Sequence, residues 1–174
     1  MSDHIIRQTL FQDVLSARRE LMRALKFLSE KEATTIEFRP DWCVRDVISH
    51  ITAVECTALA AARHLVEDGS PEFHDPLDER DFNRGAIRRR KEFALNDVVD
   101  ELDGTRRQLL KQLRKVPDPQ LFAPFPVGWT GEQQSIADVL AHMASHDYEH
   151  ANDIWRWRAS SGHLKRERFR DLML

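Results

Sequence analysis

The sequence of 174 residues lacks several features that would assign it to a common protein class. It has no apolar run close to the ~20 residues that span a bilayer, so we expect no membrane partner. Its first residues, MSDHIIRQTL, lack the basic and apolar regions of a signal peptide, which favours a cytoplasmic location. It also lacks a Gly-rich phosphate loop and a G-x-S-x-G nucleophile elbow, which mark two large groups of enzymes.

Cysteine is scarce, because Cys43 and Cys56 are the only two in the sequence. We place both on one helix, where a rise of ~1.5 Å per residue separates them by roughly 20 Å. A disulfide cannot span that distance, so we expect free thiols in a reducing compartment.

The charge balance argues against a nucleic-acid partner. The net charge is -3 and the pI is about 6.2, whereas nucleic-acid binders usually carry a basic face. The one basic run, Arg88 to Lys91, is short and typical of a solvated helix face.

Hydrophobic residues make up 41% and charged residues 32%, which is a globular composition. The length fits a single domain over residues 1–174.

Apolar residues recur at helical spacing in four long segments. These segments cover about residues 3–30, 42–68, 97–115 and 135–159. A short helix is expected at 78–92, and the Pro-rich stretch 116–134 is expected to be a loop, with no strand in the chain. The predicted fold class is all-α, an up-down four-helix bundle with a long crossover or short extra helix between helices 2 and 3.

Several helix ends carry residues that favour capping. Asp41 and Asn96 are the candidate N-caps of the second and third long helices. Ser135 and Asp138 resemble a capping box at the start of the fourth, and Gly69 is expected to stop the second.

The fourth long helix carries an informative pair, His146 and His150. Their spacing places both imidazoles on one face, one turn apart, where they can bind one ion at ~2.1 Å from each nitrogen. Both also lie in the apolar row of this helix, between Met143 and Ile154. A buried imidazole needs a partner for each nitrogen, and a metal ion would supply one of them.

A third ligand has to come from another helix. His142 lies ~12 Å along the axis from His150, too far for the same ion. His50, at the edge of the apolar face of the second helix, is the best candidate, because bundles build metal sites from inward side chains on facing helices. The alternative is that these histidines are hydrogen-bonded structural residues. The remaining histidines lie at ends or in polar surroundings and are not expected to be ligands: His4, His64, His74 and His163.

Three segments together resemble the DinB/YfiT-like superfamily of metal-dependent four-helix bundles. They are DWCVRDVISHI (Asp41 to Ile51), DFNR (Asp81 to Arg84) with the arginine-rich helix after it, and His142 to Trp157. The resemblance covers about residues 5–160. It implies that His50, His146 and His150 bind one divalent metal ion, with water in the open positions. Asp153 departs from the family, since many members have Gln at that position.

The family resemblance also implies a class of reaction. Members include thiol-dependent isomerases, such as the mycothiol-dependent maleylpyruvate isomerase, and thiol S-transferases. The expected protein is a metal-dependent enzyme with a small-molecule substrate and a low-molecular-weight thiol, and imidazole ligands suit zinc, nickel or iron. The alternatives are a metal-dependent hydrolase and a non-enzymatic helical module for binding or dimerisation. A homodimer is suggested by Trp155 and Trp157, which cannot both face inward easily.

Several charged residues lie near the candidate ligands in the sequence or on the arginine-rich helix. Glu55, Asp147 and Glu149 could act as bases or orient ligands, but solvation at the surface is the simpler interpretation. Arg84 and Arg88 could bind a substrate carboxylate, although a solvated helix face is again simpler.

Overall fold

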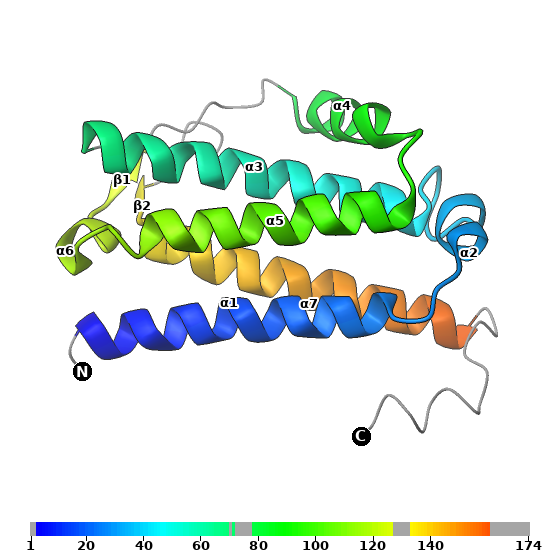
Figure 1. Ribbon diagram of the computed structural model, residues 1–174, viewed down its shortest axis with the longest axis horizontal. Coiled ribbons are helices and arrows are strands. Elements are labelled where there is room, and N and C mark those ends of the chain that lie inside the picture. Colours follow the sequence, from blue (N-terminus) through cyan, green and yellow to red (C-terminus); the bar gives the residue numbers. More distant parts are fainter. Residues whose placement is uncertain (1–2, 70, 72–77, 127–132, 161–174) are drawn as a thin grey trace.

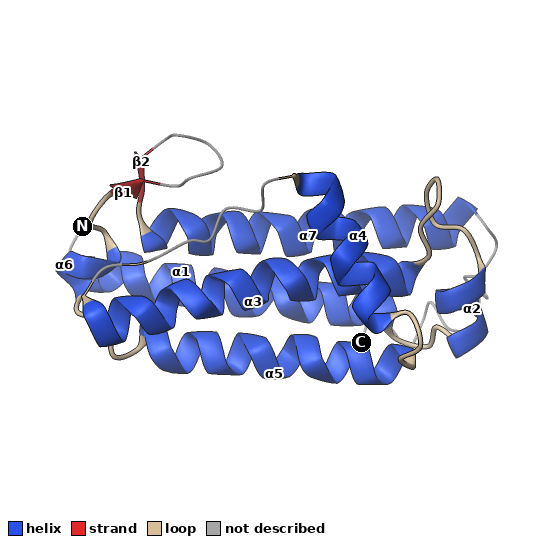
Figure 2. Ribbon diagram, turned by 90° about the horizontal axis from the view of Figure 1, so that it is seen from above, coloured by secondary structure: helices blue, strands red, loops and turns tan. Residues whose placement is uncertain are grey.

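Four long helices form the body of the protein in the computed structural model, which describes residues 3–69, 71, 78–126 and 133–160. They are α1 (Asp3–Leu25), α3 (Val44–Asp68), α5 (Leu95–Leu113) and α7 (Ile136–Ser160). α1 packs along α7 and α3 packs along α5 (Figures 1 and 2). The all-α bundle predicted from the apolar periodicity is therefore confirmed. Among the described helices, none combines the length and the apolar character needed to cross a membrane.

The helix directions explain the crossover between the second and third long helices. In Figure 1, α1 and α7 run in one direction, while α3 and α5 both run in the other. Because α3 and α5 are parallel, the chain between them has to return along the length of the bundle. The short helix α4 (Glu79–Arg90) lies on this return and packs against α3. The predicted crossover and short helix are both confirmed.

The first long helix is shorter than the predicted segment 3–30. It ends at Leu25, and a separate short helix, α2 (Glu30–Thr35), follows it. This helix begins after Ser29, whose hydroxyl accepts a hydrogen bond from the Glu32 N–H, while the Glu32 carboxylate accepts one from the Ser29 N–H. Such a capping box starts a new helix where the apolar spacing alone predicted a continuous one.

Two predicted N-caps are wrong. α3 begins after Cys43, and the Asp46 carboxylate accepts a hydrogen bond from the Cys43 N–H at 2.9 Å. Asp41 lies instead in the preceding turn, with a left-handed φ of 65°. α5 begins after Ala94, so Asn96 lies inside the first turn of the helix and not at its cap. In both cases a good capping residue stands two positions from the true helix boundary.

Other predicted helix boundaries are confirmed. Gly69 ends α3 with a φ of 78°, a left-handed conformation that glycine adopts without steric cost. Ser135 and Asp138 form the predicted capping box of α7, with reciprocal hydrogen bonds of 2.8 and 3.2 Å. Cys43 and Cys56 are both free thiols.

The stretch 116–134 contains regular structure within its described residues, 116–126 and 133–134, where a loop was predicted. It contains α6 (Asp118–Leu121), and its strand β1 (Phe125–Pro126) pairs antiparallel with β2 (Gln133–Gln134). The prediction of no strand is therefore wrong for this small hairpin. Strands of two residues are too short to show the alternating pattern from which strands are predicted.

The two tryptophans near the end of α7 both contact their own chain. Trp155 Nε1 donates to the Glu20 carboxylate at 3.0 Å, and Trp157 Nε1 donates to the Glu37 carbonyl at 3.1 Å. Both indoles are thus accommodated within the bundle, contrary to the expectation from the sequence. They no longer favour a homodimer, which stays a prediction.

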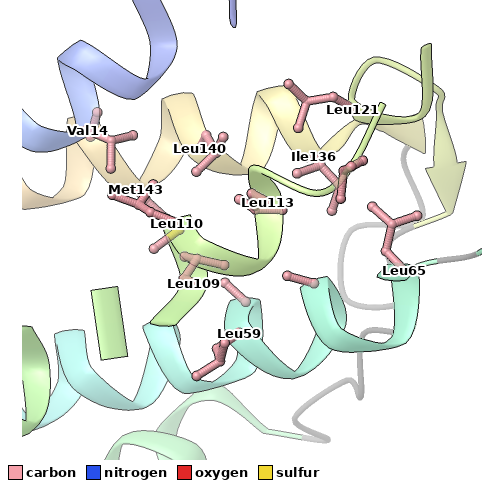
Figure 3. Packing of buried hydrophobic residues seen from close by; sticks show 14 of the residues in the cluster. Val14, Leu59, Leu65, Leu109, Leu110, Leu113, Leu121, Ile136, Leu140 and Met143 are labelled. Atoms are coloured by element: carbon pink, nitrogen blue, oxygen red, sulfur yellow. The ribbon is translucent and has the colours of Figure 1, made fainter. Parts of the chain in front are cut away.

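Buried apolar side chains form two clusters along the bundle. One lies toward α6 and includes Leu109, Leu121 and Leu140, and Figure 3 shows their packing. The other includes Leu102 and Ile154, together with Ala33 of α2, a helix at the opposite end of the bundle (Figure 1).

Four buried charged side chains separate these clusters, and each comes from a different long helix. This charged layer consists of Arg18 (4% exposed), Glu55 (1%), Arg106 (2%) and Asp147 (0%). Arg18 donates to Glu55 at 2.8 Å and to Asp147 at 2.9 Å. Arg106 donates to both of these carboxylates. Two cations and two carboxylates thus neutralise one another in the core, which is what buried charges require.

Candidate metal centre

Three imidazoles from two helices converge on one point. His50 extends from α3, and His146 and His150 extend from successive turns of α7. The Nε2 atom of His146 lies 3.0 Å from that of His50 and 2.9 Å from that of His150. One nitrogen of each ring lies within 4.8 Å of the others, and no other such group of three potential ligands occurs in the described part of the chain.

The spacing of these nitrogens fits a single ion. Two ligand atoms at ~2.1 Å from a tetrahedral ion lie roughly 3.4 Å apart, so the closest rings need to separate by only about half an ångström. The Nδ1 atom of His150 is buried and accepts or donates no hydrogen bond within the described residues. Among the described residues this imidazole therefore lacks a partner on the nitrogen that faces away from the other two rings.

Asn83 of α4 fixes the orientation of His50. The Nδ1 atom of His50 lies 2.6 Å from the side-chain oxygen of Asn83. When Nδ1 carries the proton it donates to this oxygen, so the lone pair of Nε2 points at the other two imidazoles. Metal-binding histidines are typically oriented by such a contact on the nitrogen that does not bind the ion.

Arg90 holds α4, and therefore Asn83, in place. Its guanidinium is 2% exposed and donates to both carboxylate oxygens of Glu101 on α5 at 2.6 and 2.7 Å. It also contacts the Ser49 carbonyl of α3 at 3.5 Å, one residue before His50. The arginine-rich end of α4 is thus part of the support of the site and is not wholly a solvated face.

The environment keeps all three imidazoles neutral. Burial is the main cause, and with the neighbouring positive groups it lowers the pKa of His146 and of His150 to about 3. Burial also lowers the pKa of His50, although the hydrogen bond to Asn83 opposes this shift. Because only a neutral imidazole can bind a metal ion, the rings are already in the protonation state that ligation requires.

The structure corrects the expectation that Glu55 and Asp147 are solvated. Both belong to the charged layer, where Arg18 and Arg106 occupy their oxygens. They are therefore poorly placed to serve as free bases. Asp147 directly follows His146, so its ion pairs fix the turn of α7 that carries the ligands.

The remaining charged candidates lie at the surface. Glu149 is exposed and accepts from the Ser145 hydroxyl at 3.0 Å. Arg84 pairs with Asp81 at 2.7 Å, with the two side chains 69% and 71% exposed. Arg88 is exposed as well, so the solvated-face interpretation fits both arginines.

The other described histidines are not part of the convergent group. His142 is exposed, and its ring stacks 5.9 Å from that of His146. His4 contacts Gln8, and His64 lies 3.3 Å from Asp68. The predictions for His74 and His163 lie outside the described residues.

Two residues before α3 border the site, although neither was expected there from the sequence. The Trp42 ring lies edge-on to His50, with ring centres 5.8 Å apart. The guanidinium of Arg39 lies 4.4 Å from the centre of the Trp42 ring. Burial is the largest cause of the lowered pKa of each of the three imidazoles, and the positive charge of Arg39 is a smaller cause that acts in the same direction. The signal that could have revealed them is Arg-Pro-Asp-Trp directly before the helix of His50.

Solved structures of low sequence identity share this fold. YfiT from Bacillus subtilis, described as a probable metal-dependent hydrolase with an unusual four-helix bundle topology, is 18% identical, with a TM-score of 0.76 over 93% of this chain and 90% of that one. DfsB, described as a sibling lethal factor precursor, is 14% identical, with a TM-score of 0.74 over 88% of this chain and 95% of that one.

A mycothiol-dependent maleylpyruvate isomerase is also similar. It is 14% identical, with a TM-score of 0.69 over 88% of this chain, which spans 63% of the isomerase. At such identities the likeness establishes the fold alone.

Sequence comparison assigns the family. No curated protein matches the chain. Residues 14–154 match the DinB superfamily, a region that includes His50, His146 and His150. Because this match spans most of the sequence, the protein belongs to the DinB superfamily.

Proposed function

We propose that His50, His146 and His150 bind one divalent metal ion through their Nε2 atoms. The observation that carries this proposal is the convergence of the three atoms, at 2.9 and 3.0 Å for the two closest pairs. The neutral state of the rings and the contact between His50 and Asn83 support it. Zinc, nickel and iron all suit a set of three imidazoles.

We further propose that the protein is a metal-dependent enzyme that uses a low-molecular-weight thiol. A divalent ion in such a site lowers the pKa of a thiol or water that reaches it. The thiol sulfur then forms a bond to an electrophilic carbon as the leaving group departs, and the thiol proton is released to water. The likeness in fold to an isomerase named for its dependence on mycothiol supports this choice.

Hydrolysis is the second candidate function. It is favoured by the fold shared with YfiT, which is described as a probable metal-dependent hydrolase. Three protein ligands leave room for water, which metal-dependent hydrolases activate. Water would then take the place of the thiol as nucleophile.

One pair of assays separates these candidates. Chlorodinitrobenzene serves as the electrophile with glutathione or mycothiol, since its reaction with a thiol forms a thioether and releases chloride and a proton. We expect turnover by the metal-loaded protein and loss of turnover in the matched His146→Ala variant. Nitrophenyl acetate tests hydrolysis, and its cleavage without any thiol would overturn the S-transferase proposal. Absence of both activities in protein that holds its ion would favour a non-enzymatic binding module.

A further inference from the structure

We propose that Arg39 binds a carboxylate group of the substrate next to the metal centre, so that the substrate is a small carboxylate-bearing molecule. This inference rests on the proposed metal site, and it names the chemical class of the substrate that would bind there. It replaces Arg84 and Arg88, the arginines that the sequence suggested for this role, because both lie on the exposed face of α4.

A tight turn holds Arg39 at the site. The Phe38 N–H donates to the Trp42 carbonyl at 2.8 Å, and the Trp42 N–H donates to the Arg39 carbonyl at 2.9 Å. Between them, Pro40 and Asp41, with its φ of 65°, form the two central residues of the turn. The backbone of Arg39 is therefore fixed immediately before the helix that carries His50.

The side chain of Arg39 is held by aromatic rings and not by an acid. Its guanidinium lies 4.4 Å from the Trp42 ring centre and 5.7 Å from that of Phe38. Stacking of this kind occupies the faces of the guanidinium and leaves its N–H groups free to donate at the edges. Trp42 in turn contacts His50, so the cation and the imidazoles belong to one continuous surface.

The hydrogen-bonding capacity of Arg39 is unused. Its Nε atom is buried and has no partner among the described residues, and its side chain forms no ion pair there. Burial lowers the pKa of Arg39, and the negative charge of Asp153 partly offsets this shift. The Asp153 carboxylate forms its ion pair with Arg156 and not with Arg39. A half-buried cation without a counterion is stabilised by an anion that arrives with the ligand.

The charge at this position fits a carboxylate better than a phosphate. The planar fork of arginine matches the two oxygens of a carboxylate, and one cation balances one such charge. A phosphate group carries more charge and usually meets several donors or a helix N-terminus. Among the described groups that act on Arg39 or on the imidazoles, Arg39 is the only arginine or lysine: the others are Asp153 of α7, Glu79 and Asn83 of α4, and the neutral histidines.

Calorimetric titration of the metal-loaded protein tests this assignment with succinate and with propionate. Succinate offers one carboxylate to the metal and one to Arg39, whereas propionate offers only one. We expect succinate to bind about tenfold more tightly than propionate. Arg39→Gln should abolish this preference, and Arg39→Lys should reduce it severalfold, because lysine keeps the charge but lacks the fork. Arg84→Gln, which removes an exposed cation beside Asn83, is the matched control and should leave the preference unchanged.

The metal content of each protein is measured as well, because it distinguishes failure of the proposed metal site from failure of the role proposed for Arg39. Wild-type protein that retains no ion would contradict the proposed function. Variants at Arg39 that hold their ion and keep the full preference for succinate would overturn this inference and leave the metal site standing. Inorganic phosphate that binds more tightly than succinate, in a manner that depends on Arg39, would overturn the carboxylate assignment. If Arg39→Gln does not fold by circular dichroism, Arg39→Lys decides the outcome.

Discussion

The imidazole of His50 is oriented by Asn83, which lies on a different helix, through a contact of 2.6 Å between Nδ1 and the amide oxygen. Through this contact α4 reaches the three convergent imidazoles. It joins the crossover between α3 and α5 to the site, because α4 lies on that crossover. The crossover between α3 and α5 thus places a supporting residue beside His50.

Loss of this contact should weaken metal binding without unfolding the protein. We expect Asn83→Ala to lower the affinity for zinc roughly 10- to 100-fold, because the His50 ring loses its orientation. Asn83→Asp keeps an oxygen acceptor and should stay close to the wild type. Competition with a chromogenic chelator measures the affinity. Equal affinities in Asn83→Ala and wild type would show that Asn83 does not position the ligand.

The charged layer should make a large contribution to stability. Glu55→Gln leaves Arg18 and Arg106 with one carboxylate between them, and we expect a loss of about 3 kcal/mol in the free energy of unfolding. Asp81→Asn removes an acid from the exposed pair with Arg84 and should cost below about 1 kcal/mol. Urea denaturation measures both values. A cost for Glu55→Gln as small as that of the surface control would contradict the assigned role of the layer.

Acid should destabilise the metal-free protein through its buried histidines. In the folded state the pKa of His146 and of His150 is about 3, whereas in the unfolded chain it is about 6.5. Between these values the unfolded state binds more protons, so stability is complete above about pH 6.5 and falls as the pH decreases toward 3. From pH 7 to pH 5 we expect a loss of about 2 kcal/mol for each of the two histidines, or roughly 4 kcal/mol for the pair.

Urea denaturation in the presence of a chelator measures this dependence. The His146→Asn variant, which lacks one of the two groups, should show a shallower fall over the same range. A wild-type stability that is constant between pH 7 and pH 5 would contradict the neutral, buried state of the imidazoles.

The long helices could be predicted because each buries one face, and apolar residues therefore recur every three or four positions. His146 and His150 could be predicted for the same reason, since they interrupt an apolar row. His50 required an argument about facing helices and the family resemblance. What the spacing could not reveal was where α1 gives way to α2, because the capping box at Ser29 overrides a continuous apolar pattern.

The charged layer leaves a signal in the amino-acid sequence. Arg18 lies between Val14 and Leu21, four residues after one and three before the other, and both are fully buried. The same spacing places Glu55 and Arg106 between core residues of their own helices. A charge inside an apolar row has to be paired, so these positions predict a buried network.

Asn83 and Arg39 could not be predicted as site residues by spacing. Asn83 reaches His50 from a helix that begins after a long crossover, and only the three-dimensional path of that segment brings the two together. Arg39 stacks on Trp42, three residues along the chain, but only the contact between Trp42 and His50 connects this pair to the imidazoles. Contacts of this kind depend on tertiary structure, which local sequence does not determine.

Metal stoichiometry tests the central claim most directly. Protein purified without an affinity tag or chelator is analysed for bound ions, alongside His50→Ala, His146→Ala and His150→Ala, with His64→Ala as the control at a site remote from the three rings. We predict about one divalent ion per chain in the wild type and in His64→Ala, and its loss from each of the other three variants with helicity retained. A wild-type protein that binds no divalent ion even after incubation with zinc, nickel or iron(II) would contradict the account.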